Sequence, residues 1–439
     1  MRHRELSLLG ASLSFPLFFT TGLSIFGGDA SSQEFAFPFG FFVAVVCFFG
    51  FGLRFIASLS QAGPVLMLGG LGITTLGALV QIGVGDWSLL LIYCVPAVVG
   101  FFMAWTVNIK SDEAIHAVFI GFACAAVCAA ALHLAASFVT YGFVGAFSVR
   151  GEDSIFGVFS IYQKYIYYAT ILAFGFFFVL IFFEGWIRWL SVLMLVSDIL
   201  LIGSREAILL VLFFALASSF LEKKSLVRRV FFLVAVIATA SVILFFLFII
   251  MREHLDEFVF MAKIVSIANS EDTSSLSAGR LDTIINVTSA FDIDGLFIFF
   301  GSGFQTDIGE MGTPHNQYVE WFLRGGLVFL LFNTLFLCVA VYRHLLIGGR
   351  THFAAGIMLL ATLIISNNIN TPFRVPYTSI WLWLLIGYSF RPASRLCTAS
   401  SGRVRSSGMP GDWRGTSQSN TYVADALDYG YRQPQGERD

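Results

Sequence analysis

Residues 301–327, GSGFQTDIGEMGTPHNQYVEWFLRGGL, decide how the fold of this 439-residue chain is interpreted. They close the only long polar interruption before residue 390, in a sequence that otherwise consists of long apolar runs. A His-Asn pair and an arginine stand at the end of this interruption, directly before a hydrophobic stretch. Charged groups beside a membrane span are costly unless they lie at its surface or in a wet cavity. We therefore expect a polar site at one face of a bilayer.

The composition is that of an integral membrane protein. Hydrophobic residues make up 57% of the chain and charged residues only 12%, with a mean hydropathy of +0.81, whereas soluble domains carry about 25% charged residues. Many apolar runs reach the roughly 20 residues that a helix needs to cross a bilayer. They lack the alternation of a transmembrane barrel. The sequence thus predicts an all-α polytopic membrane protein.

About twelve membrane spans are predicted from the apolar runs between polar breaks. The seventh and eighth are separated by residues 201–204 alone, and the last two spans are short. We expect a transmembrane domain over 1–390, with a large outer loop at 251–324, and a disordered cytoplasmic tail over 391–439. The spans are placed at 5–27, 36–55, 63–83, 87–108, 114–139, 161–183, 185–202, 205–221, 229–250, 325–345, 352–367 and 376–390.

Lysine and arginine set the expected orientation, because positive charges are retained in the cytoplasm. With both termini inside the cell, 18 of the 26 basic residues fall in cytoplasmic segments. We expect a bacterial inner membrane, with the long loop in the periplasm. The other eight basic residues lie at or near the outer face and are candidates for function: Arg150, Lys164, Arg205, Arg252, Lys263, Arg280, Arg324 and Arg374.

The N-terminal segment has features of a signal peptide, with a basic stretch at 1–5 and small residues at 28–30. The apolar run between them, however, exceeds the about 7–15 residues of a signal peptide, so we expect a retained helix.

The cysteines do not predict a disulfide framework or a zinc site. Of the six, five lie in apolar spans and one in the tail, without the spacing that either would need. No phosphate-binding loop motif is present, which disfavours an ATP-driven machine.

The loop at 251–324 is expected to fold onto the helix ends. An amphipathic segment comes first, and a second short helix follows with Arg280 in its first turn. After Pro314, helical spacing places His315, Tyr318 and Phe322 on one face.

These residues resemble a family. GSGF at 301–304, followed by PHNQYVEWFLRGGL at 314–327, is similar to the G-x-G…H-N-x-Y-x-E…G-G signature of the O-antigen ligase and O-antigen/exopolysaccharide polymerase superfamily of bacterial envelope enzymes. SREAILL at 204–210 and GRLD at 279–282 are similar to its two arginine-bearing segments. The resemblance extends over most of residues 5–390.

The resemblance implies an enzyme that acts on glycans carried by undecaprenyl diphosphate, inverting the anomeric carbon without nucleotide sugar, cofactor or metal. Arginine suits the charge that develops on a diphosphate leaving group. Arg205 and Arg280 are therefore the expected diphosphate clamp, and His315 is the expected general base for the acceptor hydroxyl. Residues predicted to bind substrate are Asn316, Tyr318, Glu320, Arg324, Arg150, Lys164 and Arg374.

Each candidate also has a structural explanation. Arg205 could mark a helix start at the interface, and Arg280 could be a surface charge in a loop. His315 could belong to a helix start, whereas Asn316, Tyr318 and Glu320 could serve only as structural partners of that helix. Arginines 324 and 374 could be interfacial anchors. The Asn367, Asn368 and Asn370 group could bind sugar hydroxyls or cap a helix.

Three functions remain open at this point. The first is a polymerase that moves a growing lipid-linked chain onto a repeat unit, and the second is a ligase that moves the finished chain onto lipid A core. The third is a non-enzymatic transporter of lipid-linked sugars. Expected partners are the lipid-linked glycan, membrane lipid, lipid A core and other polysaccharide-assembly proteins, with no nucleic acid. Polar residues at the outer ends of spans favour an enzyme.

The clamp predicts the behaviour of a conservative variant. Arg280→Lys should lose most transfer activity at normal expression, because a point charge cannot replace the planar guanidinium fork. Product formation by membranes containing equal amounts of each protein would measure this. Wild-type turnover by the lysine variant would exclude a bidentate clamp.

Overall fold

The computed structural model describes residues 3–14, 61–82, 88–106, 112–148, 165–221, 295–304 and 315–391. The chain divides into two units, Met1–Arg391 and Pro392–Asp439, and all described residues belong to the first. Within these ranges the regular structure is helical, without a strand. The predicted spans at 36–55 and 229–250, and most of the loop at 251–324, lie outside the described residues. So does the predicted tail beyond Arg391.

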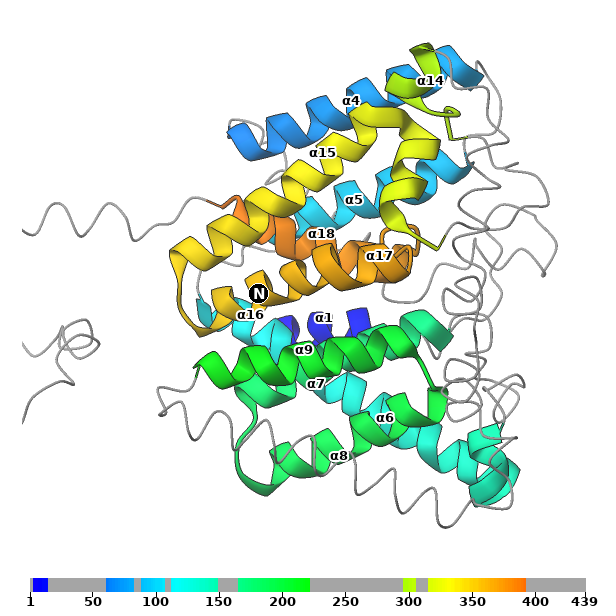
Figure 1. Cartoon of the computed structure of the whole chain (residues 1–439). Helices are drawn as coiled ribbons and strands as arrows, with labels where there is room; N and C mark the ends of the chain where they lie inside the picture. The colour runs from blue at the N-terminus through cyan, green and yellow to red at the C-terminus, as the bar shows by residue number, and fades with distance from the viewer. Residues whose placement is uncertain are drawn as a thin grey trace, which may run out of the picture. The chain divides into compact units, whose positions relative to one another are not determined.

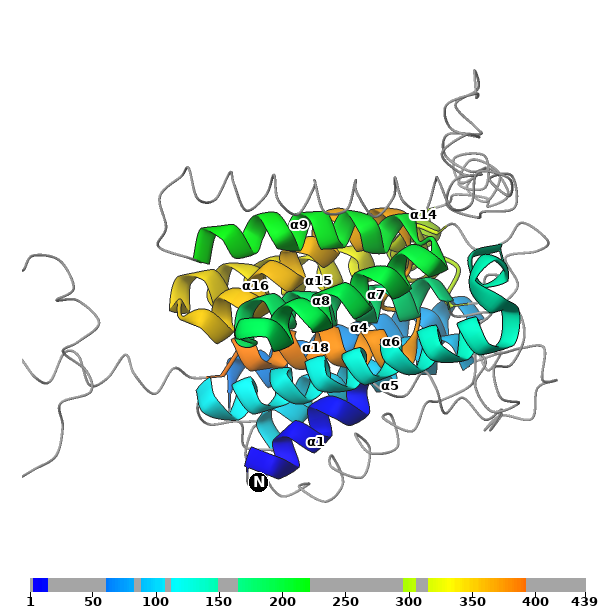
Figure 2. The ribbon, with the colours of Figure 1, turned by 90° about the horizontal axis from the view of Figure 1, so that it is seen from below.

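The described helices run roughly along one direction as an antiparallel bundle (Figures 1 and 2). Five segments are long and apolar enough to cross a membrane: Ala62–Gln81, Glu113–Val139, Gly185–Ile202, Gln317–Ile347 and Arg350–Ile369. The protein is therefore an all-α protein suited to a membrane. The elements are α1 (His3–Ser14), α4 (Ala62–Ile82), α5 (Ser88–Thr106), α6 (Asp112–Ser148), α7 (Tyr165–Phe182), α8 (Gly185–Ile202), α9 (Arg205–Leu221), α14 (Gly295–Phe300), α15 (Gln317–Ile347), α16 (Arg350–Ala361), the π-helical turn η6 (Thr362–Ser366), α17 (Asn367–Ile369) and α18 (Pro376–Ser389).

The weakly predicted break between the seventh and eighth spans is a sharp corner. Gly203 ends α8 in the left-handed conformation, with φ 67° and ψ 32°, and its N–H donates to the carbonyls of Ile199 and Leu200. The Ser204 hydroxyl then accepts from the N–H of Ala207 at 3.4 Å. A left-handed glycine followed by a hydroxyl cap stops one helix and starts the next. Two residues therefore suffice to separate α8 from α9.

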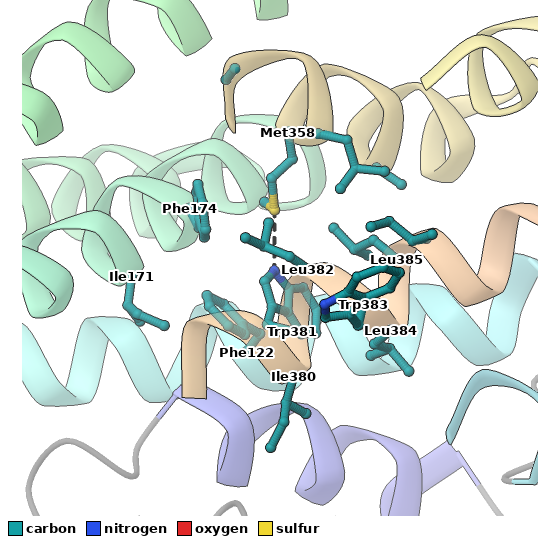
Figure 3. Close-up of a cluster of buried hydrophobic side chains, with 14 of the residues drawn as sticks. Phe122, Ile171, Phe174, Met358, Ile380, Trp381, Leu382, Trp383, Leu384 and Leu385 are labelled. Atoms are coloured by element: carbon teal, nitrogen blue, oxygen red, sulfur yellow. Dashed lines mark hydrogen bonds between the residues drawn. The ribbon is translucent and has the colours of Figure 1, made fainter. Parts of the chain in front are cut away.

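Aromatic packing fills the centre of the bundle. Figure 3 shows Trp381 of α18 among side chains from α6, α7 and α16. The Trp381 indole N–H donates to the sulfur of Met358 at 3.2 Å, and its ring stacks on Phe122 with centroids 4.4 Å apart. Such aromatic pairs add about 0.5–1.5 kcal/mol beyond area burial. Because lipid is as apolar as these side chains, close packing rather than water exclusion holds the helices together.

Two helix pairs depend on close backbone contact at glycine. A Cβ atom added to Gly121 of α6 would lie 1.8 Å from the Ser7 carbonyl oxygen of α1. One added to Gly387 of α18 would lie 2.2 Å from the Phe101 carbonyl oxygen of α5. Small residues at such crossings allow the van der Waals packing that drives helix association in lipid.

Helix α15 is broken at Gly326, which adopts φ 63° and ψ −165°. The break is paired with the GSGF segment: the Ser302 N–H donates to the Leu323 carbonyl at 2.7 Å, and the Phe304 N–H donates to the Arg324 carbonyl at 3.0 Å. Backbone carbonyls released by a break need such donors, since lipid offers none. The two halves of the sequence signature, GSGF and RGG, thus form one structural unit.

Three arginines that the sequence predicts on the cytoplasmic side donate to carbonyls at helix C-termini. They lie at the end of the bundle opposite the start of α15. The Arg343 Nε donates to the Ser389 carbonyl of α18 at 2.8 Å. Near the end of α7, the Arg188 Nε donates to the Phe183 carbonyl at 2.7 Å, and Arg350 donates to the Ile181 carbonyl. Cations near a helix C-terminus satisfy its last carbonyls and complement its dipole.

The break in α15 predicts that Gly326→Ala destabilises the fold. The combination of φ 63° and ψ −165° is essentially restricted to glycine and costs another residue on the order of 1–3 kcal/mol, and the added Cβ would lie 2.2 Å from the Phe299 carbonyl carbon. We expect a clear drop in the thermal midpoint in detergent, measured by the fraction remaining monodisperse after heating. Gly72→Ala is the matched control, because nothing lies within 4 Å of its added Cβ. Equal midpoints for the two variants would show that α15 does not require its break.

Candidate functional site

The start of α15 places the first candidate residues. Asn316 caps the helix, with its Oδ1 accepting from the N–H groups of Tyr318 and Val319 at 3.0 and 3.1 Å. His315 precedes the cap in the left-handed region, at φ 48°. The expectation that His315 shares a helix face with Tyr318 is therefore wrong, because the cap starts the helix after it. A non-glycine residue held in this region is strained, and such strain concentrates at functional sites.

A fully buried carboxylate lies one turn into α15. Glu320 is 0% exposed, and its Oε1 lies 3.3 Å from the Arg324 Nε and 3.5 Å from an Nη of Arg374. The Tyr93 hydroxyl of α5 donates to the same oxygen at 3.4 Å. One carboxylate oxygen thus contacts two guanidinium groups. The Arg374 side chain is 14% exposed, whereas that of Arg324 is 3% exposed.

Arg374 is positioned by the turn between α17 and α18. The Phe373 N–H donates to the Gln317 Oε1 at 2.9 Å, which ties this turn to the first residue of α15. The Arg374 N–H donates to the Thr371 carbonyl at 3.1 Å. Backbone hydrogen bonds on both sides therefore hold the arginine over Glu320.

The start of α9 reaches the same turn. Glu206 is 2% exposed, and its Oε2 accepts from the Asn370 Nδ2 at 3.0 Å. Tyr167 of α7 hydrogen-bonds through its hydroxyl to the Thr371 hydroxyl at 2.9 Å. Arg205 is partly exposed, and no ion pair joins its guanidinium to another described residue. The starts of α7, α9 and α15 therefore meet the turn before α18 at one end of the bundle (Figure 1).

Several buried polar atoms at this end lack a hydrogen-bond partner among the described residues. They are the Glu320 Oε2, the Trp321 Nε1, the Ser366 Oγ and the Asn370 Oδ1. A buried polar group left unpaired costs about 1–3 kcal/mol, so such a concentration needs an explanation. Both donors and acceptors are represented, which suits a ligand bearing hydroxyl groups.

The structure brings most of the predicted site residues to this end. His315, Asn316, Tyr318, Glu320 and Arg324 lie in or beside the first turns of α15, with Arg374 and Arg205 on neighbouring elements. The Tyr318 hydroxyl donates to the Leu363 carbonyl at 2.5 Å, and the Asn316 Nδ2 donates to the Asn368 carbonyl at 3.4 Å. Arg150, Lys164 and Arg280 lie outside the described residues, so their roles stay predictions.

Three residues of the cluster were missed by the sequence analysis. Glu206 had a signal, since a carboxylate in the first turn of an apolar helix needs a partner. Tyr93 and Gln317 had none, because a tyrosine within an apolar run and a glutamine in a polar loop are both ordinary. In the described part of the chain, no group of three His, Cys, Asp or Glu side chains could hold a metal ion.

The chain was compared with known proteins. No protein-family model matches it, and no curated protein matches it either. The family assignment therefore stays a hypothesis that rests on the quoted motifs.

The Glu320 cluster predicts a large cost for removing its carboxylate. Glu320→Gln leaves the buried Arg324 without its anion, which costs about 3–5 kcal/mol in buried pairs. Thermal unfolding in detergent should report a clearly lower midpoint than wild type. Glu184→Gln is the control, because Glu184 is exposed before α8 and makes no side-chain cap. A midpoint equal to that of the control would mean that the carboxylate does not hold the two arginines.

Proposed function

We propose that the chain is a metal-independent glycosyltransferase that transfers an undecaprenyl-diphosphate-linked glycan to a glycan acceptor, polymerising O-antigen or exopolysaccharide. The observation that carries this is the gathering of Arg205, Arg324, Arg374 and His315 at one end of a membrane bundle. We place this end at the periplasmic face of the bacterial inner membrane, with both termini in the cytoplasm, following the distribution of basic residues. The twelve spans and the folded outer loop belong to this proposal.

The arginines at this end support a diphosphate ligand. The Glu320 Oε1 orients two of them, Arg324 and Arg374. Among the described residues, no ion pair joins Arg205 to a carboxylate. Guanidinium groups at a partly buried site attract phosphate and stabilise the charge that develops on it. Arg280, from the outer loop, is proposed to complete the clamp.

His315 is proposed as the general base. As the acceptor hydroxyl oxygen attacks the anomeric carbon, His315 takes the hydroxyl proton. The bond from that carbon to the diphosphate oxygen breaks, and the electron pair leaves with the lipid diphosphate. The configuration inverts in this single displacement. His315 stands directly before the Asn316 cap of α15, and an imidazole suits proton transfer near neutral pH.

Two other functions stand as alternatives. A ligase would use the same donor site and transfer the finished chain to lipid A core. A transporter of lipid-linked sugars is favoured by one observation, a His133–Asp198 pair that is buried between the helices, because intramembrane ionisable residues are common in transport pathways.

The test is reconstitution in liposomes with an undecaprenyl-diphosphate repeat unit, with and without lipid A core, followed by gel analysis of the products. A ladder on the carrier lipid that disappears in Arg280→Ala would support a polymerase. Transfer to lipid A core alone would indicate the ligase. Substrate movement across the bilayer without any product would reject the enzyme in favour of the transporter.

The proposed base predicts a separation of binding from chemistry. His315→Ala should bind the lipid-linked donor normally and lose at least about a hundredfold in transfer rate, the usual contribution of a general base. Donor binding is measured with a labelled lipid and transfer by product formation. His116→Ala is the control, because that imidazole packs on Phe182 in another part of the bundle. Full activity of His315→Ala would remove this residue from the mechanism.

A further inference from the structure

A buried polar network joins α6, α7 and α8. Asp198 of α8 is 0% exposed. Its Oδ1 lies 2.5 Å from the His133 Nδ1 of α6, and its Oδ2 accepts from the Tyr168 hydroxyl of α7 at 2.9 Å. The Ser137 Oγ lies 3.4 Å from the other nitrogen of His133. The predicted site uses none of these residues, so the network needs its own explanation.

The network matters because the buried side chains of α8 gather in its second half and are otherwise mostly apolar. Its first half is exposed, with Trp186 73% and Trp189 53% exposed, and the buried residues gather from Leu195 to Ile202. Apolar side chains pack against lipid almost as well as against protein. Apolar contacts alone therefore specify the rotation and depth of this helix poorly. A carboxylate bonded to two other helices does specify them, because leaving it unpaired in the membrane is costly.

The end of α8 fixes the start of α9. Asp198 precedes Arg205 by seven residues, and the two are joined by one helical turn and the corner at Gly203. At a rise of about 1.5 Å per residue, the carboxylate lies about one turn below the corner. On the other side of the corner, Glu206 bonds to Asn370 of the site. A shift or rotation of α8 would therefore displace Arg205.

We propose that Asp198, bonded to His133 and Tyr168, is a positioning residue that sets the place of Arg205 relative to the turn before α18. This rests on the proposed role of Arg205 in holding the diphosphate. The network itself touches no substrate. A positioning role explains the buried His133–Asp198 pair without assigning it to transport.

The first test measures position without activity. In a background free of native cysteines, Glu206→Cys and Asn370→Cys are joined by a short thiol crosslinker. We expect efficient crosslinking that falls on the order of tenfold with Asp198→Leu, the factor expected for losing a buried interhelical hydrogen bond. Asp198→Asn keeps one acceptor oxygen for Tyr168 and can donate its amide N–H to the His133 Nδ1 in the other tautomer, so it should restore most of the crosslinking. Ser191→Ala, another buried polar change in α8, is the control and should have no effect.

The second test is a double-mutant cycle on transfer. Asp198→Leu should lower the turnover about tenfold in the wild-type background and hardly further in Arg205→Ala, because its effect passes through that arginine. Unchanged crosslinking in Asp198→Leu, or additive losses in the cycle, would overturn the proposal. The proposal would also be overturned if the protein moved substrate across the bilayer in a way that requires a pH gradient and is lost in Asp198→Asn. If wild type shows no transfer but crosslinking still depends on Asp198, positioning stands and the proposed enzyme function fails.

Discussion

The pairing of the GSGF segment with the break in α15 is the constraint on which the site depends. At Gly326 the backbone turns, and the carbonyls of Leu323 and Arg324 accept from Ser302 and Phe304. A membrane helix is broken only where protein groups replace the lost hydrogen bonds. The turns of α15 before this break carry Glu320, which contacts arginines from α15 itself and from the turn before α18. The break lets the first turns of α15 leave the axis of the rest of the helix, and in those turns Glu320 meets Arg374 of the turn before α18.

Local sequence signals located most helices and were insufficient for the polar contacts. The apolar runs found the existence of the long helices, but α6 continues nine residues past its predicted end and α15 begins eight residues before its predicted start. The predicted corner before Arg205 exists because Gly203 and Ser204 are a stop and a start signal. The motifs placed His315, and the distribution of basic residues placed Arg374, at the same end. The Asp198 pairing was not found, because a lone acid in an apolar run has no periodic signal. Its partner His133 lies 65 positions away.

Basic residues serve the two ends of the bundle differently. At one end, arginines such as Arg343 donate to the last carbonyls of helices, where the helix dipole favours a cation. At the other end, arginines stand near helix starts, where the dipole opposes them. Arg374 is held there by Glu320, which compensates for the unfavourable position. An arginine held against the dipole by a buried acid is the arrangement that the proposed ligand site requires.

The exposure of the two guanidinium groups separates their roles in the proposed site. One carboxylate oxygen, the Glu320 Oε1, contacts both Arg324 and Arg374, so the fold fixes their orientation. Charge that is preorganised in this way costs no rearrangement when negative charge develops on a leaving group. If the proposed diphosphate binds here, the partly exposed Arg374, rather than the almost fully buried Arg324, is the group that would meet it.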